Sequence, residues 1–154
     1  MTTIAYKSGV MAADSGTWLS NVAYRTGNKL AVGPDGSLHG VTGNAADGCT
    51  YLRWVTDGMK GDAPKPTETD PKEGRSSFMA LVVLPDRVRL WTAHGFEEHE
   101  RPAHFAIGAG SEMAIGAMAA GATAEEAIAI VADNSEYARL PVRTIIKHGG
   151  GSSD

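Results

Sequence analysis

Short turn signals between short β-prone runs limit the folds open to this chain more than any other feature. Lys7-Ser8-Gly9 has the length and the glycine of a hairpin turn. Pro34-Asp35-Gly36 is a second turn signal, because proline presets φ and glycine accepts positive φ. The β-prone runs that flank these turns are residues 2–6, 10–13, 29–32 and 38–42. Two hairpins in succession predict an antiparallel sheet.

Helical segments alternate with further strands in the rest of the chain. Asn44 is placed to cap a helix that ends near Gly58, and Thr123 with Glu126 fits a capping box at the start of another helix. A third helix is expected at residues 111–120, and further strands at 78–84, 87–92, 105–107 and 140–146. The order of strands, helix, strands, two helices and strand predicts an α+β domain in which two packed sheets carry helices on their outer faces.

The chain of 154 residues has the size of one domain. We expect that domain to span residues 2–147, followed by a glycine-rich flexible tail at 148–154. Residues 60–77, rich in Pro, Asp, Glu, Lys and Gly, are expected to form an exposed loop. The polar stretch at 93–104 is expected to be a second loop that connects strands.

Charge and cysteine content narrow the partners and the compartment. The 14 Lys and Arg against 18 Asp and Glu give a formal charge of -4, which disfavours nucleic acid and anionic lipid as partners. Cys49 is the single cysteine, so it can form neither an internal disulfide nor a zinc site alone, and a reducing cytoplasm is the expected location. No apolar run approaches the length of a membrane span, and the first residues lack the features of a signal peptide.

Neither a cofactor nor a metal is expected. Gly108-Ala109-Gly110 follows a predicted strand, but Met113 stands where a dinucleotide fingerprint needs a third small residue. His94, His99 and His104 are spaced five apart, which suits neither one helix face nor a zinc motif.

Thr2 follows directly behind the initiator methionine, and its small side chain makes Met1 an expected substrate for removal. Thr2 would then carry a hydroxyl nucleophile together with a free α-amine that can act as its general base. The ordinary pKa of an α-amine, about 7.7–8.0, leaves a useful fraction neutral near physiological pH, and a neighbouring cation would raise that fraction. Taken alone, Thr2 is also compatible with an ordinary residue at the start of a strand.

Several segments, in order along the chain, resemble proteasome β-type subunits and the bacterial HslV peptidase. The start, Thr2-Thr3-Ile4 and then Ala12-Ala13-Asp14-Ser15, resembles the family's N-terminal threonine strand, hairpin and small-small-Asp ending. The later matching segments are Asn28-Lys29-Leu30, Gly40-Val41-Thr42-Gly43-Asn44-Ala45-Ala46-Asp47, Phe105-Ala106-Ile107-Gly108-Ala109-Gly110-Ser111 and Thr123-Ala124-Glu125-Glu126-Ala127. The resemblance runs from Thr2 to about Ile145. It implies the N-terminal nucleophile hydrolase fold, a four-layer αββα sandwich.

The resemblance also implies a set of catalytic residues. Thr2 would attack the scissile carbonyl, and its α-amine would take up and return the proton. Lys29 would tune both groups as a nearby cation, oriented by Asp14 through a charge-assisted hydrogen bond. The backbone N–H of Gly43 would stabilise the oxyanion. Taken singly, Asp14, Lys29 and Gly43 are also compatible with a turn cap, a solvated lysine and a turn glycine.

Two positions depart from the family's pattern. Ala109 stands where the family commonly has the serine of a Gly-Ser-Gly turn, and Ser111 is the candidate replacement for its hydroxyl. In the family's Asp-x-x-Ser pattern near the end of the later helix, Asp133 is the candidate match, while Ser135 lies one position early.

The function implied by the resemblance is a threonine-type endopeptidase that works as a self-assembled, ring-shaped oligomer on peptides or unfolded chains. The chain has no P-loop, so any ATPase partner would be a separate protein. Two alternatives stay open. One is a catalytically inactive structural component of such a ring, and the other is a small-amide hydrolase on the same fold.

Overall fold

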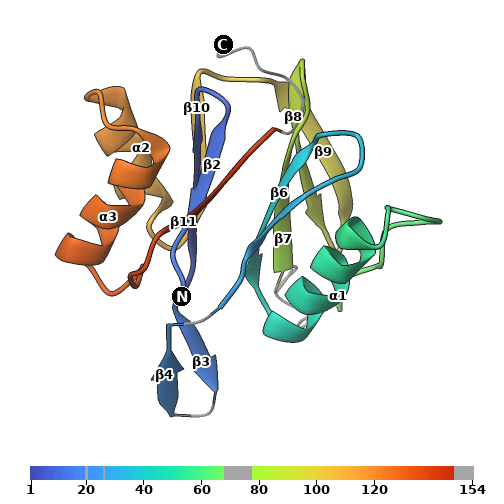
Figure 1. The fold of residues 1–154 in the computed structure, drawn as a ribbon, viewed down its shortest axis with the longest axis horizontal. Coiled ribbons are helices and arrows are strands. Elements are labelled where there is room, and N and C mark those ends of the chain that lie inside the picture. Colours follow the sequence, from blue (N-terminus) through green and yellow to red (C-terminus); the bar gives the residue numbers. More distant parts are fainter. Residues whose placement is uncertain (20, 26, 68–77, 148–154) are drawn as a thin grey trace.

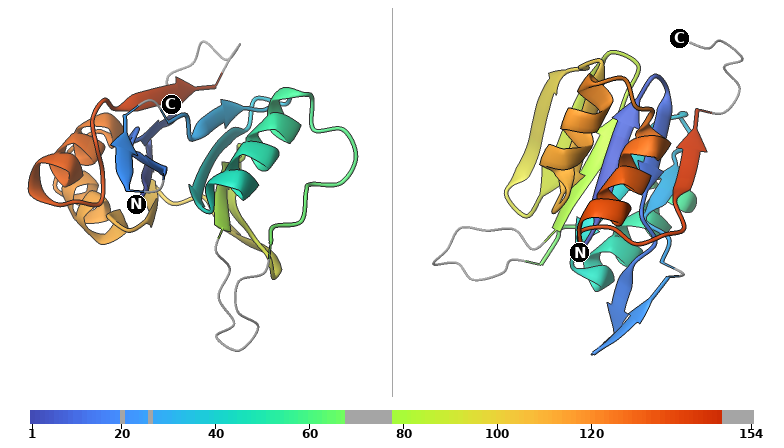
Figure 2. Two further views of the ribbon diagram at one scale, coloured as in Figure 1. Left: turned by 90° about the horizontal axis from the view of Figure 1, so that it is seen from below. Right: turned by 90° about the vertical axis from the view of Figure 1, so that its left-hand side faces the viewer.

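The computed structural model describes residues 1–19, 21–25, 27–67 and 78–147. Two antiparallel sheets face each other and helices cover the outer face of each, so the layers run helix, sheet, sheet, helix (Figure 1). The same order of layers is visible from below in Figure 2. The expected tail at 148–154 and part of the expected loop, residues 68–77, lie outside the described residues.

The first sheet has the strand order β10-β1-β2-β11. Its centre is the hairpin of β1 (Thr3–Lys7) and β2 (Val10–Ala13), flanked by β10 (His104–Gly108) and β11 (Arg143–Ile146). The two turn residues of the hairpin both have positive φ, as a type I′ turn requires. The first predicted hairpin is therefore confirmed, and tertiary pairing adds the two flanking strands from the other end of the chain.

The second sheet is a five-stranded meander of β5 (Leu30–Val32), β6 (Leu38–Gly43), β7 (Phe78–Val83), β8 (Arg87–Thr92) and β9 (Gly95–Glu100). Every pair of neighbouring strands is antiparallel. The predicted hairpins β5–β6 and β7–β8 are confirmed.

The helices begin where the sequence predicts. α1 (Ala45–Thr56) lies on the second sheet, and the Asn44 side chain accepts two backbone N–H groups at its start. α2 (Ser111–Ala119) and α3 (Ala124–Asn134) lie on the first sheet, and the capping box at the start of α3 is formed.

Packing between the layers explains the burial pattern. The side chains between the two sheets are large and apolar, including Ile4, Met11, Leu38, Leu81 and Val88. The layer under α2 and α3 is rich in alanine, including Ala5, Ala12, Ala114 and Ala127. Small side chains there let both helices lie close to the strand that carries the N-terminus.

The structure corrects three expectations. The hairpin of β3 (Thr17–Leu19) and β4 (Val22–Tyr24), which projects from the lower end of the sandwich in Figure 1, was not expected. The expectation of a loop at 93–104 is wrong, because β9 pairs there with β8 despite its polar, exposed side chains. β11 is shorter than the expected 140–146 and begins after Pro141, which has no N–H to donate to a ladder.

None of the helices in the described part of the chain is both long enough and apolar enough to cross a membrane.

Candidate active site

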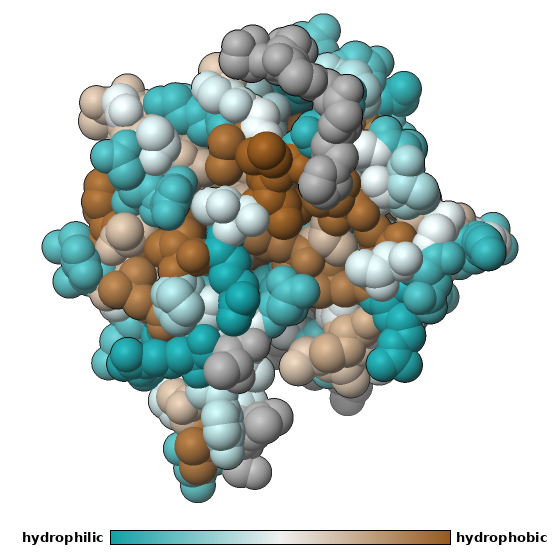
Figure 3. All heavy atoms as spheres, in the orientation of Figure 1, coloured by the Kyte–Doolittle hydropathy of each residue, from teal (hydrophilic) through white to brown (hydrophobic). Residues whose placement is uncertain are grey.

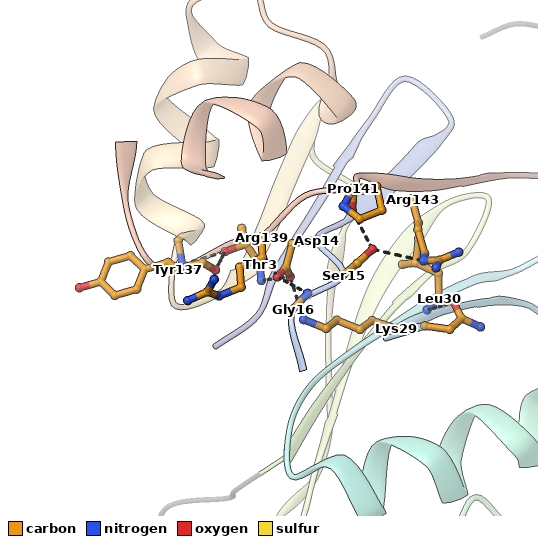
Figure 4. Close-up of polar contacts among 12 residues, drawn as sticks. Thr3, Asp14, Ser15, Gly16, Lys29, Leu30, Tyr137, Arg139, Pro141 and Arg143 are labelled. Atoms are coloured by element: carbon orange, nitrogen blue, oxygen red, sulfur yellow. Dashed lines mark hydrogen bonds and ion pairs between the residues drawn. The ribbon is translucent and has the colours of Figure 1, made fainter. Parts of the chain in front are cut away.

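Asp14 lies at the end of β2 with its carboxylate fully buried, and four hydrogen bonds converge on it (Figure 4). Its Oδ1 accepts the backbone N–H of Thr3 at 3.1 Å and the ammonium group of Lys29 at 2.9 Å. Its Oδ2 accepts the backbone N–H groups of Gly16 at 3.1 Å and Arg139 at 3.0 Å. These four donors replace the water that a buried carboxylate loses. We call these five residues the Asp14 cluster.

Lys29 immediately precedes β5 and is almost fully buried, with 9% of its side chain exposed. Burial lowers the pKa of Lys29, while the charge of Asp14 and the hydrogen bond to it act in the opposite direction. Asp14 follows a strand of the first sheet and Lys29 precedes a strand of the second, so this ion pair bridges the two sheets. It fixes one positive charge beside the start of β1.

The α-amine of the chain lies in the field of this ion pair. Burial lowers the pKa of the Met1 α-amine, and the positive charges of Lys29 and Arg139 also lower it, whereas Asp14 raises it. Desolvation and a nearby cation both disfavour an ammonium ion. An amine at this end of the chain is therefore held in surroundings that favour its neutral, basic form.

Thr2 is anchored by the turn that follows β10. Its carbonyl accepts the N–H of Ala109 at 2.9 Å. Gly108 has a φ of +97°, and a Cβ at this position would overlap the Thr2 carbonyl oxygen. A Cβ at Gly110 would lie 2.5 Å from Oγ1 of Thr3. Glycine is needed on both sides of Ala109 because the threonine strand passes too close for a side chain.

Thr3 is a residue of this site that sequence reasoning missed. It is fully buried, its Oγ1 donates to the Tyr137 carbonyl at 2.8 Å, and the same oxygen accepts the Gly110 N–H at 3.1 Å. The Thr2-Thr3 doublet was the available signal. The partners lie 134 and 107 residues away in sequence, so no local pattern could identify them.

The other residues singled out from the sequence lie at the ends of elements. Gly43 ends β6 with a φ of +95°, Ser111 is the half-buried first residue of α2, and Asp133 is exposed near the end of α3. Within the described residues, no hydrogen bond or ion pair joins these three to the Asp14 cluster. The structure thus brings Asp14 and Lys29 to the threonine strand through hydrogen bonds, and does not link Gly43, Ser111 or Asp133 to them in that way.

A second buried polar cluster lies elsewhere, under α1. His39 in β6 is fully buried, with Nε2 2.7 Å from Ser37 Oγ and Nδ1 2.8 Å from the hydroxyl of Tyr51 in α1. Ser37 also donates a short hydrogen bond to the carboxylate of Asp35. We call these four residues the His39 cluster.

The hydrogen-bond directions in the His39 cluster follow from counting protons. Ser37 has one hydroxyl proton and gives it to Asp35, so Ser37 Oγ must accept a proton from Nε2 of His39. Nδ1 of the neutral imidazole is then the acceptor for the hydroxyl of Tyr51. Burial lowers the pKa of His39 to about 4 and raises the pKa of Tyr51, which keeps both groups neutral.

No group of three His, Cys, Asp or Glu side chains in the described ranges is arranged to hold a metal ion. His99 in β9 is 3.1 Å from Glu97 on the exposed face of that strand, so this pair lies on the outside of the molecule.

The chain is similar to known proteins in fold but has little sequence similarity to them. No protein-family model and no curated protein sequence matches the chain. Among solved structures, the BPH protein of Thiobacillus denitrificans in complex with epoxomicin matches with a TM-score of 0.65 and 20% identity, covering 94% of this chain and 96% of that one. HslV from Trypanosoma brucei matches with a TM-score of 0.65 and 19% identity, covering 96% of this chain and 100% of that one. The chain therefore has the proteasome-type N-terminal nucleophile hydrolase fold, and the expected αββα sandwich is confirmed.

Proposed function

We propose that this protein is a threonine-type peptidase whose nucleophile is Thr2, exposed as the N-terminal residue when Met1 is removed. The observation that carries the proposal is the buried ion pair of Lys29 and Asp14 at the start of β1, where Asp14 also binds the backbone N–H of Thr3. A buried ion pair costs free energy to desolvate, and replacement by apolar side chains is often neutral or stabilising. Its position beside the chain terminus favours a chemical role.

The proposed reaction uses the two functional groups of Thr2. The hydroxyl oxygen forms a bond to the scissile carbonyl carbon while the neutral α-amine takes the hydroxyl proton. The amine then gives this proton to the departing amine of the substrate, which leaves an ester on Thr2. Water, deprotonated by the same α-amine, attacks the ester and releases the acid product. Lys29 lowers the pKa of the α-amine of Met1, and its positive charge would act in the same direction on the amine of Thr2. It would thus favour the neutral amine that starts the reaction and the return of the proton to the leaving group.

Gly43 is the proposed oxyanion donor. With a φ of +95° it takes a conformation that residues with a side chain rarely adopt, and it lies between β6 and the Asn44 cap of α1. A backbone N–H without a neighbouring side chain admits a substrate carbonyl closely.

Ser111 and Asp133 are proposed as supporting residues from the resemblance, and their positions in the fold differ. Ser111 directly follows Gly110, whose N–H binds the Thr3 hydroxyl, so it starts α2 next to the threonine strand. Asp133 is exposed and is the weaker candidate by position. Ser111→Ala and Asp133→Asn are the variants that would test a contribution of either side chain to the rate.

The active form is proposed to be a homo-oligomeric ring in the cytoplasm that acts on peptides or unfolded chains, with any ATPase supplied by another protein. The fold shared with HslV supports assembly. So does the surface, where hydrophobic residues gather on the central part of the face drawn in Figure 3. Ile146 of β11, which crosses this face, is 58% exposed. The exposed free thiol of Cys49 supports a reducing compartment.

A non-catalytic ring component is the second candidate, and observations at two positions favour it. The hydroxyl of Ser135 donates to the Val131 carbonyl at 2.8 Å, within its own helix end, and Ala109 has no hydroxyl. Of the two hydroxyl groups that the family pattern places around the amine, one is therefore missing and the other donates its hydrogen bond elsewhere.

The experiment that separates the two candidates is the intact mass of the purified protein before and after incubation with epoxomicin, an epoxyketone that needs both a threonine hydroxyl and a free α-amine. A peptidase will have lost Met1, gain one adduct, and lose this reactivity in Thr2→Ala. Thr2→Ser, which keeps both functional groups, is the matched control and should still react. Retention of Met1, or a free Thr2 that never reacts, would reject the peptidase and favour the structural ring.

A further inference from the structure

A pocket of about 290 Å³ lies beside the Asp14 cluster. Its lining includes Arg25, which follows β4, and Ser135, Glu136, Arg139 and Leu140, which lie between α3 and β11. Drug-sized ligands occupy pockets of about 300–1,000 Å³, so this one has room for one side chain or one terminal residue of a peptide.

The segment that forms one wall of the pocket also holds the proposed reactive end of the chain. The backbone carbonyl of Tyr137 accepts the hydroxyl of Thr3 at 2.8 Å, and the backbone N–H of Arg139 binds Asp14 at 3.0 Å. The positive charge of Arg139 also acts on the Met1 α-amine and lowers its pKa, after burial and Lys29. One short segment, residues 137–139, therefore connects the pocket to the threonine strand, although residues 1–3 do not themselves line the pocket.

Two of the residues that line the pocket, Arg25 and Arg139, carry guanidinium groups. Arg139 stacks over the ring of Trp18, with 5.1 Å between the guanidinium carbon and the ring centroid. Stacking uses the face of the guanidinium and leaves its in-plane N–H groups available. In the described part of the chain neither Arg25 nor Arg139 forms an ion pair, although Glu136 lines the same pocket.

We infer that this pocket is a substrate subsite for a carboxylate group, bound by the guanidinium groups of Arg25 and Arg139 beside the N-terminal threonine. Two guanidinium groups and one carboxylate give the lining one net positive charge. A guanidinium matches a carboxylate with two parallel hydrogen bonds. The carboxylate is either the free C-terminus of a short peptide or an Asp or Glu side chain near the scissile bond. The inference rests on the proposed peptidase function and specifies its substrate class.

The test uses the full chain, with Thr2 shown to be free and reactive by the epoxomicin assay. Two pools of randomised octapeptides, identical except that one ends in a carboxylate and the other in an amide, are digested separately, and the products are identified by mass spectrometry. A subsite for the C-terminal carboxylate predicts faster cleavage of the acid pool, with cuts near its C-terminus. A subsite for side chains predicts enrichment of Asp and Glu over Asn and Gln next to the cut in both pools.

Substitutions of the charged residues in the pocket test whether the preference for a carboxylate arises there. Arg25→Gln with Arg139→Gln should reduce the preference for the carboxylate on the order of tenfold, because hydrogen bonds to a charged group are lost. Glu136→Gln removes the one negative charge and should increase the preference. The matched control is Arg101→Gln, an exposed arginine between β9 and β10, which should leave it unchanged. Arg25→Gln alone, at an exposed position, guards against misfolding caused by loss of the stacking on Trp18.

The results distinguish failure of the proposed subsite from failure of the proposed peptidase. If Thr2 reacts with epoxomicin and peptides are cleaved without preference for a carboxylate, the subsite is rejected and the peptidase stands. If the preference exists but Arg25→Gln and Glu136→Gln leave it unchanged, the pocket is not its source. If Thr2 neither reacts nor cleaves any peptide, the peptidase and the subsite are both rejected.

Discussion

The Asp14 cluster and the His39 cluster are both buried and polar, but they differ in charge. The Asp14 cluster contains a buried charged pair and adjoins the chain terminus and a pocket. The His39 cluster is neutral at its centre, because burial keeps the imidazole unprotonated and the Tyr51 hydroxyl protonated, and it ends on the exposed carboxylate of Asp35. A fold stabilised by hydrogen bonds alone would favour the second arrangement, since neutral groups cost less to bury.

The clusters also differ in how far apart their members are in sequence. His39 contacts residues 2 and 12 positions away, within one sheet and its covering helix. Asp14 contacts residues 2, 11, 15 and 125 positions away, and so joins both sheets and the connection between α3 and β11. The difference indicates that the His39 cluster stabilises one layer, whereas the Asp14 cluster assembles a site from several. Four predictions test this contrast, beginning with the largest expected effect.

Lys29→Met should have the largest effect, because it leaves the carboxylate of Asp14 buried without its cation. Breaking a buried ion pair costs about 3–5 kcal/mol of unfolding free energy. Reaction of Thr2 with epoxomicin should be lost as well. Urea unfolding and intact mass measure the two effects. Adding Asp14→Asn removes the buried charge and should recover part of the stability without restoring the reaction. Recovery is incomplete because the amide NH2 must face at least one backbone N–H, that of Thr3 or those of Gly16 and Arg139. A single variant that reacts at the wild-type rate would contradict a chemical role for Lys29.

Lowering the pH should decrease the unfolding free energy, because His39 is buried in its neutral form. The pKa of His39 falls from its ordinary 6.5 to about 4 on folding because burial disfavours the imidazolium. Above pH 6.5 both states leave the ring neutral, and as pH falls toward 4 only the unfolded state gains a proton. Stability should therefore decrease over this window by roughly 3 kcal/mol. Urea unfolding at pH 7, 5.5 and 4 measures the decrease. His39→Gln should reduce the slope, while the exposed His99→Gln should keep it; equal slopes in wild type and His39→Gln would reject the assignment.

Gly110→Ala should disturb the threonine strand, because the new Cβ would lie 2.5 Å from both Thr3 Oγ1 and Val131 Cγ1. Overpacking of this kind costs about 1–3 kcal/mol, and the epoxomicin reaction should slow. Gly116→Ala is the matched control, since no atom lies within 4 Å of a Cβ there and the residue is inside α2. It should stabilise the protein by about 0.5–1 kcal/mol. Equal melting temperatures for the two variants would contradict the close approach of Gly110 to Thr3.

Tyr51→Phe should have the smallest effect, because it removes the hydroxyl that binds Nδ1 of His39 and keeps the ring. Loss of one buried hydrogen bond costs about 1–2 kcal/mol. The rate of reaction with epoxomicin should remain at the wild-type value, which separates this cluster from the Asp14 cluster. A slowed reaction with unchanged stability would show that the two clusters are coupled.

Local sequence signals determined much of the fold. The turn between β1 and β2 needs two residues with positive φ, and the caps at Asn44 and Thr123 need one side chain each, so neighbours a few residues away suffice. β9 and the hairpin of β3 and β4 were missed for the converse reason. They are polar or exposed strands, and backbone pairing with a neighbouring strand, rather than a buried apolar face, forms them.

The candidate site divides in the same way. Local sequence identified Thr2 behind a removable methionine, and a family resemblance supplied Asp14, Lys29, Gly43, Ser111 and Asp133. The packing of the two sheets adds Thr3, Tyr137 and the backbone of Arg139 to the site, and it brings Asp14 and Lys29 into contact. The physical reason is that turns and caps are short-range contacts along one segment. The Asp14 cluster and the pocket beside it exist only when strands from both ends of the chain are packed together.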